Sequence, residues 1–267
     1  TPLSITISDD EDGTFTYAAT EYCKTGSNPT PNITGTTGGT FSSTTGLSIN
    51  ASTGEIDLTA STAGTYTISY LTSSNTCAVT GTFDVTITED EDGTFTYASA
   101  GYCVSGIDPT PNITGTTGGT FSSTTGLSIN ASTGEIDLSA STAGTYTVSY
   151  LTSSNTCAVT GTFDVTITDD EDGTFTYAAT EYCKSGSNPT PTITGTTGGT
   201  FSSTAGLSIN GSTGVIDIAA STVGTYTVSY VTSSNLCAVT GTFDVTITDD
   251  EDGTFTYASA EYCISGS

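Results

Sequence analysis

The sequence repeats every 80 residues, and this periodicity constrains the fold more than any other feature. The segment TGTTGGTFSST begins at Thr34, Thr114 and Thr194, with no insertion or deletion between copies. A period of this length is too long for one coil of a solenoid and fits one small domain per repeat. We therefore expect several small domains in tandem.

The phase of the repeat predicts five segments. Residues 1–8 align with the end of a repeat, at 81–88, and predict the closing strand of a preceding repeat. Three complete repeats follow, and the chain then begins a further one, so we expect it to be a window of a longer array. The predicted segments are 1–8, 9–88, 89–168, 169–248 and 249–267.

Each repeat has the alternation of an all-β domain. Tyr66, Ile68 and Tyr70 alternate with Thr and Ser, as do Phe83, Val85 and Ile87, which is typical of half-buried strands. About seven short strands separated by turns predict an immunoglobulin-like β-sandwich in every repeat. The fold class is therefore tandem immunoglobulin-like sandwiches of 80 residues.

Turn and loop residues separate the predicted strands. The segment 50–54 (NASTG) predicts a hairpin loop in which Gly54 takes a positive φ. Pro29 and Pro31 favour a loop or a sheet edge, because proline lacks the N–H that a central strand needs. Among the tyrosines, Tyr66 and Tyr70 are expected in the core, and Tyr22 is expected to be exposed.

Two cysteines recur in each repeat, without a CxxC motif or any histidine, so zinc and thioredoxin-type sites are disfavoured. A regular pair in a small secreted domain indicates a disulfide. Pairing within a repeat is expected, because one cysteine follows the opening strand and the other precedes the closing strand of one domain. The alternative, Cys77 with Cys103, would cross a junction, and Cys263 is expected to have no partner. The expected disulfides are Cys23–Cys77, Cys103–Cys157 and Cys183–Cys237.

Sixteen of the 28 acidic residues form four clusters of four, each where one repeat meets the next. Carboxylate oxygens are the ligands that Ca²⁺ takes, although the spacing does not match an EF-hand loop. A solvated acidic linker that keeps neighbouring domains apart explains the clusters equally well, so both interpretations stay open. The candidate calcium ligands are Asp9, Asp10, Asp12, Asp90, Glu91, Asp92, Asp170, Glu171 and Asp172.

The composition excludes several functions. The net charge is −26, and Lys24 and Lys184 are the only cations, so nothing could neutralise nucleic-acid phosphates or bind an anionic membrane. No apolar run approaches the roughly 18 residues of a spanning helix. Nucleophilic catalysis needs a base, but there is no His, and Val104 replaces Lys24 in the second repeat. We expect the protein not to be an enzyme and to have no certain cofactor.

The repeat as a whole resembles those of giant secreted surface proteins of Bacteroidota, including the SprB-type mobile adhesins of gliding bacteria. The matching pieces are YC-x-SG-x-xPTP, GGTFSST-x-GLSIN-x-STG-x-I-D and GTYT-[IV]-SY followed by a second Cys. The resemblance implies a bacterial cell-surface location, type IX secretion, and a role in adhesion or gliding motility. It does not imply calcium binding.

Three functional hypotheses follow. The leading one is a structural repeat region, the stalk or filament shaft of an extracellular adhesin, whose partners are neighbouring repeats of the same chain. The second is a glycan-binding module for surface polysaccharide. The third is a subunit that exchanges strands with other copies to form a polymeric filament.

Overall fold

A computed structural model describes residues 3, 5, 7–73, 76–154 and 156–258. The described residues form strands and no helix, and three similar repeats of about 80 residues carry eight strands each. This confirms the predicted all-β fold class. The strands of the first repeat are β1 (Phe15–Thr16), β2 (Glu21–Cys23), β3 (Asn32–Ile33), β4 (Thr40–Ser43), β5 (Ser48–Ile49), β6 (Ile56–Asp57), β7 (Gly64–Leu71) and β8 (Thr80–Thr88).

The other two repeats reproduce this series. The second contains β9 (Phe95–Thr96), β10 (Gly101–Cys103), β11 (Asn112–Ile113), β12 (Thr120–Ser123), β13 (Ser128–Ile129), β14 (Ile136–Asp137), β15 (Gly144–Leu151) and β16 (Thr160–Thr168). The third contains β17 (Phe175–Thr176), β18 (Glu181–Cys183), β19 (Thr192–Ile193), β20 (Thr200–Ser203), β21 (Ser208–Ile209), β22 (Ile216–Asp217), β23 (Gly224–Val231) and β24 (Thr240–Thr248).

The chain forms two compact units. One comprises residues 1–100, 107–141 and 145–165, and the other comprises 101–106, 142–144 and 166–267. The first repeat lies in the first unit, the third repeat lies in the second, and the middle repeat contributes to both. The repeat boundaries inferred from the sequence stay predictions.

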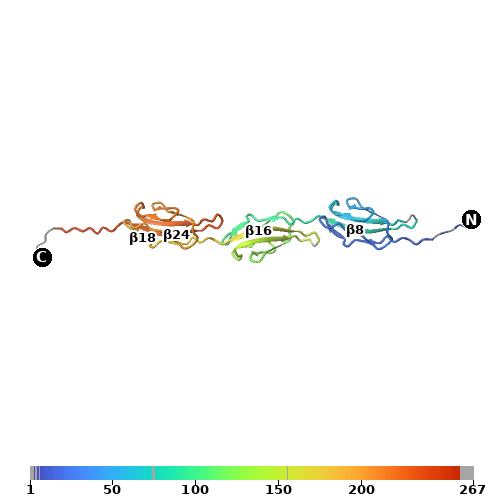
Figure 1. Cartoon of the computed structure of the whole chain (residues 1–267), viewed down its shortest axis with the longest axis horizontal. Coiled ribbons are helices and arrows are strands. Elements are labelled where there is room, and N and C mark those ends of the chain that lie inside the picture. Colours follow the sequence, from blue (N-terminus) through green and yellow to red (C-terminus); the bar gives the residue numbers. More distant parts are fainter. Residues whose placement is uncertain (1–2, 4, 6, 74–75, 155, 259–267) are drawn as a thin grey trace. The chain divides into compact units, whose positions relative to one another are not determined.

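The main sheet of each repeat has four strands, in the order β2-β8-β7-β4 in the first repeat, β10-β16-β15-β12 in the second and β18-β24-β23-β20 in the third. Figure 1 labels β8, β16 and β24, the last strand of each repeat. β8 is antiparallel to β7, and β4 is antiparallel to β7 on its other side. The order β4-β7-β8 is that of strands C, F and G in an immunoglobulin domain. β2 runs parallel to the last residues of β8, with Cys23 opposite Thr88.

Two short hairpin-like pairs, β1 with β3 and β5 with β6, complete the sandwich. The side chains that alternate inward form the core, as predicted, while the intervening Thr and Ser face solvent. The buried cluster of the first repeat comprises Phe15, Tyr17, Phe41, Leu47, Ile56, Leu58, Tyr66, Ile68, Tyr70, Val85 and Ile87.

The core tyrosines keep their hydroxyl groups hydrogen-bonded, which allows a polar group to be buried. Tyr66, near the start of β7, donates to the carbonyl of Thr62 at 2.8 Å, which is the tyrosine corner of immunoglobulin-like domains. Tyr70 donates to the carbonyl of Thr36 at 2.8 Å. Burial raises the pKa of Tyr17 above its ordinary value.

The predicted loops are also present. Residues 50–55 connect β5 to β6, and Gly54 has a φ of +72°. A Cβ at Gly54 would lie 2.6 Å from the ring of Pro31, so both the backbone angle and the space require glycine. Pro29 and Pro31 precede β3 and lie outside every strand.

Candidate functional site

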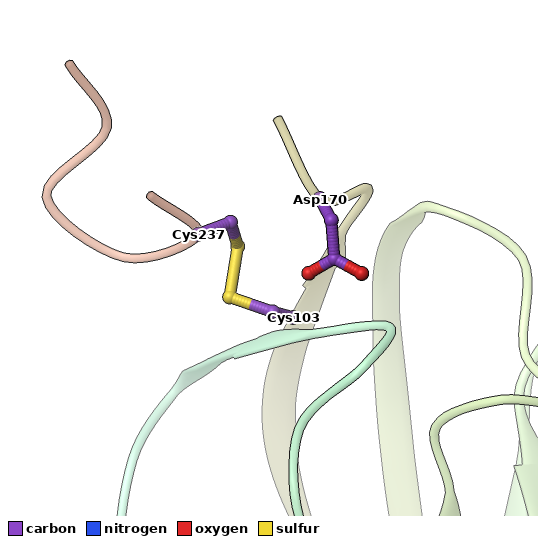
Figure 2. A group of neighbouring side chains, drawn as sticks. All are labelled: Cys103, Asp170 and Cys237. Carbon is purple, nitrogen blue, oxygen red and sulfur yellow. A yellow bond between two sulfur atoms is a disulfide. The ribbon is translucent and has the colours of Figure 1, made fainter. Parts of the chain in front are cut away.

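Two disulfides cross from one repeat to the next. Cys23 is bonded to Cys157, and Cys103 is bonded to Cys237, with Cα–Cα distances of 5.4 and 5.5 Å. In each pair the first cysteine belongs to one repeat and the second to the repeat that follows. Figure 2 shows the Cys103–Cys237 bond with Asp170 beside it. We call each such region a joint.

The predicted pairing within a repeat is therefore wrong, and so is the alternative of Cys77 with Cys103. Cys23 lies at the end of β2, opposite Thr88 at the end of β8, whereas Cys77 precedes Thr80, where β8 begins. A strand of this length separates the two positions by roughly 26 Å at 3.3 Å per residue. A disulfide needs Cα atoms within about 7 Å, so the cysteines of one repeat cannot reach each other.

The joint brings the end of β2 against a hairpin loop of the next repeat. Cys157 lies in the loop between β15 and β16 and is 3% exposed. Its backbone N–H donates to the hydroxyl of Ser154 at 2.9 Å, which fixes the loop. Thr156 beside it donates to the carboxylate of Glu21, on β2, at 3.3 Å.

In the second and third acidic clusters, the second residue holds the turn that follows β2, or its equivalent β10, in the preceding repeat. Asp90 accepts hydrogen bonds from the N–H and the hydroxyl of Thr25, at 3.1 and 2.7 Å. Asp170 accepts from the hydroxyl of Ser105 at 2.8 Å. The donor lies 65 residues before the acceptor in both cases, so this carboxylate ties the linker back to the repeat it leaves.

The third residue of the cluster binds the hairpin loop of the next repeat. Glu91 donates its N–H to the carbonyl of Cys157 at 3.2 Å, and its carboxylate accepts the N–H of Ser154 at 2.9 Å. Glu171 makes the same two contacts with Cys237 and Ser234, at 3.2 and 2.8 Å. The linker is thus hydrogen-bonded to the loop that carries the bonded cysteine.

The fourth residue starts the next repeat. Asp92 accepts the N–H of Thr94 at 2.9 Å and also the hydroxyl of that threonine. The N–H of Asp92 donates to the hydroxyl of Thr116 at 3.0 Å. The bond from the Thr94 hydroxyl, aided by the N–H, lowers the pKa of Asp92 below its ordinary value. The same bonds lower the pKa of Asp12 and Asp172.

The first residue of the cluster differs between repeats. Glu89 forms an ion pair with Lys24 at 3.3 Å, and both side chains are partly exposed, so its contribution to stability is about 0–1 kcal/mol. Lys184 instead donates to backbone carbonyls, among them that of Ala219 at 3.1 Å. In the second joint Val104 takes the place of Lys24, so that joint forms without this ion pair.

Many of the candidate calcium ligands accept hydrogen bonds from other groups of the protein. Neighbouring residues of one cluster bind different repeats. Within the described parts of the chain, the one group of three candidate ligand side chains within reach of a common centre is Cys103, Asp170 and Cys237. The two sulfur atoms of that group are bonded to each other (Figure 2), so neither offers a thiolate. Calcium binding at the acidic clusters stays a prediction from sequence.

Acidification is expected to remove the contribution that the Asp92 carboxylate makes to folding stability. Because its folded pKa is lowered, the ionised group adds stability above the unfolded pKa, near 3.8, and loses it as the pH falls through the folded value. Asp92→Asn keeps the acceptor oxygen without the charge. Its melting temperature should lie below that of the wild type at pH 6, and the difference should narrow below pH 3.8. Thr94→Val, which removes the main donor, should weaken the pH dependence too; a gap between wild type and Asp92→Asn that stays constant with pH would contradict the assignment.

Four of the six cysteines expected in disulfides are in disulfides, with different partners. Cys77 donates its thiol to the carbonyl of Ser8 at 4.0 Å, and Cys183 accepts the hydroxyl of Thr248 at 3.6 Å. Both are thiols in the structure. The prediction for Cys263 lies outside the described residues.

Tyr22 is half-buried and not exposed as expected. It packs against the core of its repeat, and its hydroxyl accepts the N–H of Ala19 at 2.9 Å. Tyr182 packs in the same way in the third repeat. The core of the repeat therefore covers part of each of these two rings.

Comparison with known proteins gives neighbours in structure only. No protein-family profile and no curated protein matches the chain. A SusE-like surface-located polysaccharide-binding protein from the heparin utilisation locus of Bacteroides thetaiotaomicron is 13% identical, over 88% of this chain and 72% of that one, with a TM-score of 0.27. The three-domain fragment I67–I69 of titin is 10% identical, over 91% of this chain and 100% of the fragment, with a TM-score of 0.41. Mouse cadherin-23 repeats EC22–24 are 12% identical, over 90% and 100%, with a TM-score of 0.27.

In the part of the chain that the structure describes, no helix is long and apolar enough to cross a membrane.

Proposed function

We propose that this chain is a structural region of an extracellular adhesin, a stalk or filament shaft in which every repeat is covalently fastened to the next. The observation that carries the proposal is the pairing of Cys23 with Cys157 and of Cys103 with Cys237. A domain that stabilised only itself would pair its own cysteines. Disulfides between successive repeats instead hold the array of repeats together.

The joints are suited to carrying tension. A pull that reaches Cys23 passes through the disulfide to Cys157 and then back along the chain to Cys103, so the backbone of residues 24–102 is a longer, slack path. The acidic linker, with its hydrogen bonds to both repeats, then orients the joint without bearing the load. Disulfides persist in oxidising compartments, which supports an extracellular location.

Adhesion, gliding motility and type IX secretion rest on the resemblance of the repeat sequence to surface proteins of Bacteroidota. The proposed role needs no catalytic group and no cofactor. The polar, strongly acidic surface, with a net charge of −26, suits a spacer that neither sticks to neighbouring spacers nor binds anionic polymers.

A binding assay separates the shaft from a glycan-binding module. The oxidised chain, immobilised on beads, is incubated with a panel of neutral and anionic polysaccharides at concentrations up to about 1 mM in binding sites, where an affinity of about 4 kcal/mol is detectable. The shaft predicts no more retention than on blank beads. Saturable retention of one polysaccharide, competed by its free oligosaccharide, would refute the shaft in favour of the glycan module.

A further inference from the structure

The hairpin loop meets the receiving strand with the same backbone contact in the joint that contains Cys23, the first joint, and in the one that contains Cys103, the second joint. The Sγ atom of Cys23 lies 3.1 Å from the carbonyl oxygen of Thr156. The Sγ atom of Cys103 lies 3.1 Å from the carbonyl oxygen of Leu236, at the equivalent position of the following loop. The backbone contact therefore does not distinguish the two joints.

The side chains at this contact do distinguish them. The loop is TSSNTCAV at 152–159 and TSSNLCAV at 232–239, so the two loops differ only at the residue before the bonded cysteine. On the strand that receives the loop, Glu21 of β2 is replaced by Gly101 of β10. Both strands run parallel to the last strand of their repeat, in the same register. Both replacements therefore occur where the loop meets the strand.

The first joint has a polar contact at this point. The hydroxyl of Thr156 donates to one oxygen of the Glu21 carboxylate at 3.3 Å. The other oxygen accepts the hydroxyl of Thr88 at 3.0 Å, which orients the carboxylate from within its own repeat. A hydrogen bond to a charged group is stronger than one between neutral groups. A leucine in place of Thr156 would remove this donor.

The second joint has an apolar contact instead. A Cβ atom at Gly101 would lie 3.1 Å from a terminal methyl carbon of Leu236, closer than ordinary van der Waals contact. Leu236 is 51% exposed, so the rest of its surface is covered. The strand itself does not require glycine, because Glu21 and Glu181 take the same register in the other two repeats. Gly101 therefore provides the space that the leucine of the loop occupies.

We propose that Glu21 and Gly101 select the loop that each receiving strand accepts, through Thr156 and Leu236. A strand with the glutamate fits the threonine loop, and a strand with the glycine fits the leucine loop. This inference rests on the proposed shaft and adds that successive joints of a nearly identical array are not interchangeable.

A mismatched loop is disfavoured in either direction, for different reasons. The leucine loop on Glu21 would place an apolar side chain against a carboxylate and displace water that solvates the charge. The threonine loop on Gly101 would lose the apolar contact and bring a hydroxyl where there is no carboxylate to accept its hydrogen bond. The loops have otherwise identical sequences, so the selection depends on this one position of the loop.

Exchange of the four residues between the joints of the intact chain tests the selection. The strand variant carries Glu21→Gly and Gly101→Glu, and the loop variant carries Thr156→Leu and Leu236→Thr. Either variant alone mismatches both joints. The combined variant carries all four substitutions, matches both joints again and has the composition of the wild type.

The equilibrium between thiols and disulfide at each joint measures how well the loop fits. Each chain is equilibrated in buffers with different ratios of reduced to oxidised glutathione, quenched with acid and alkylated. Mass spectrometry of the linked peptides then gives the fractions of the Cys23–Cys157 and Cys103–Cys237 bonds. A loop that fits its strand holds the two sulfurs together and raises the equilibrium constant for oxidation.

In the strand variant and in the loop variant, we expect this constant to fall by about threefold or more at both bonds, the equivalent of one lost hydrogen bond. In the combined variant, both constants should return to within about twofold of the wild-type values, because the contacts are moved and not lost.

Two results would overturn the proposal. One is that the constants of the strand and loop variants equal those of the wild type. The other is that the combined variant is no closer to the wild type than the strand or loop variant, as expected if the substitutions only disturb their own repeats. The shaft requires only that the wild type form both bonds, so failure of the selection is distinct from failure of the shaft.

Discussion

Stretching the oxidised chain from its two ends is expected to release less than half of the length that the reduced chain releases. With both disulfides intact, the shortest covalent path runs through residues 1–23, 103–157 and 237–267. At about 3.5 Å per residue this path extends to roughly 370 Å, against roughly 930 Å for the whole reduced chain. The remaining residues lie in slack loops that feel no tension.

Optical tweezers with handles at the two ends measure this difference directly. In the reduced chain we expect three large unfolding steps, one per repeat, each of up to about 280 Å for 80 residues. In the oxidised chain the largest step should be that of residues 103–157, up to about 190 Å. A Cys23→Ser, Cys103→Ser double variant should behave as reduced under oxidising conditions, and Cys183→Ser should not. Equal release with and without reductant would show that the disulfides do not bridge repeats.

Replacing Phe121 by alanine is expected to melt the middle repeat far below the other two. Phe121 is 2% exposed, with its ring centroid 4.5 Å from that of Tyr150 and 5.3 Å from that of Phe95. Removing a buried phenylalanine costs about 3–5 kcal/mol, because the cavity does not fully collapse. For a domain of this size that lowers the melting temperature by at least about 12 °C.

Scanning calorimetry resolves this effect, since only one of the three repeats carries the change. Ser122→Ala, on the adjacent exposed position of β12, serves as the control and should shift melting by less than about 4 °C, the equivalent of 0.5 kcal/mol or less. A Phe121→Ala transition indistinguishable from that of the control would contradict the position of the core.

The fold could be predicted because its signals are local. The alternation of Tyr66, Ile68 and Tyr70 with polar residues determines which face of β7 is buried, and all three are in the core. The loop at Gly54 follows from the backbone angle that only glycine readily adopts. These features can be predicted without knowing which strands pair with one another in the sheet.

The joint could not be predicted because it depends on the direction of a three-residue strand. The sequence of Glu21–Cys23 fits β2 either parallel or antiparallel to β8, and only the parallel register carries Cys23 to the end of the repeat that faces away from Cys77. The bonded cysteines are separated by 134 residues, and not by the 54 residues that separate Cys23 from Cys77. That register excludes pairing within a repeat.

The acidic cluster was similarly ambiguous. Four adjacent carboxylates indicate one site, yet the backbone directs Asp90 to Thr25 in the preceding repeat and Glu91 to Ser154 in the next. The donors are hydroxyl and N–H groups more than 60 residues away in sequence, on both sides. Without the fold, nothing in the cluster distinguishes a metal site from a set of separate hydrogen-bond acceptors.

Peptide mapping of the oxidised chain under non-reducing conditions tests the central claim most directly. Cleavage at acidic residues places Cys77 and Cys157 on peptides that differ at Thr59 against Ser139 and Ile68 against Val148, so their masses are distinct. The structure predicts peptides that join Cys23 to Cys157 and Cys103 to Cys237. Peptides that join Cys23 to Cys77 and Cys103 to Cys157 would show that each repeat closes on itself, and would contradict the covalently fastened array.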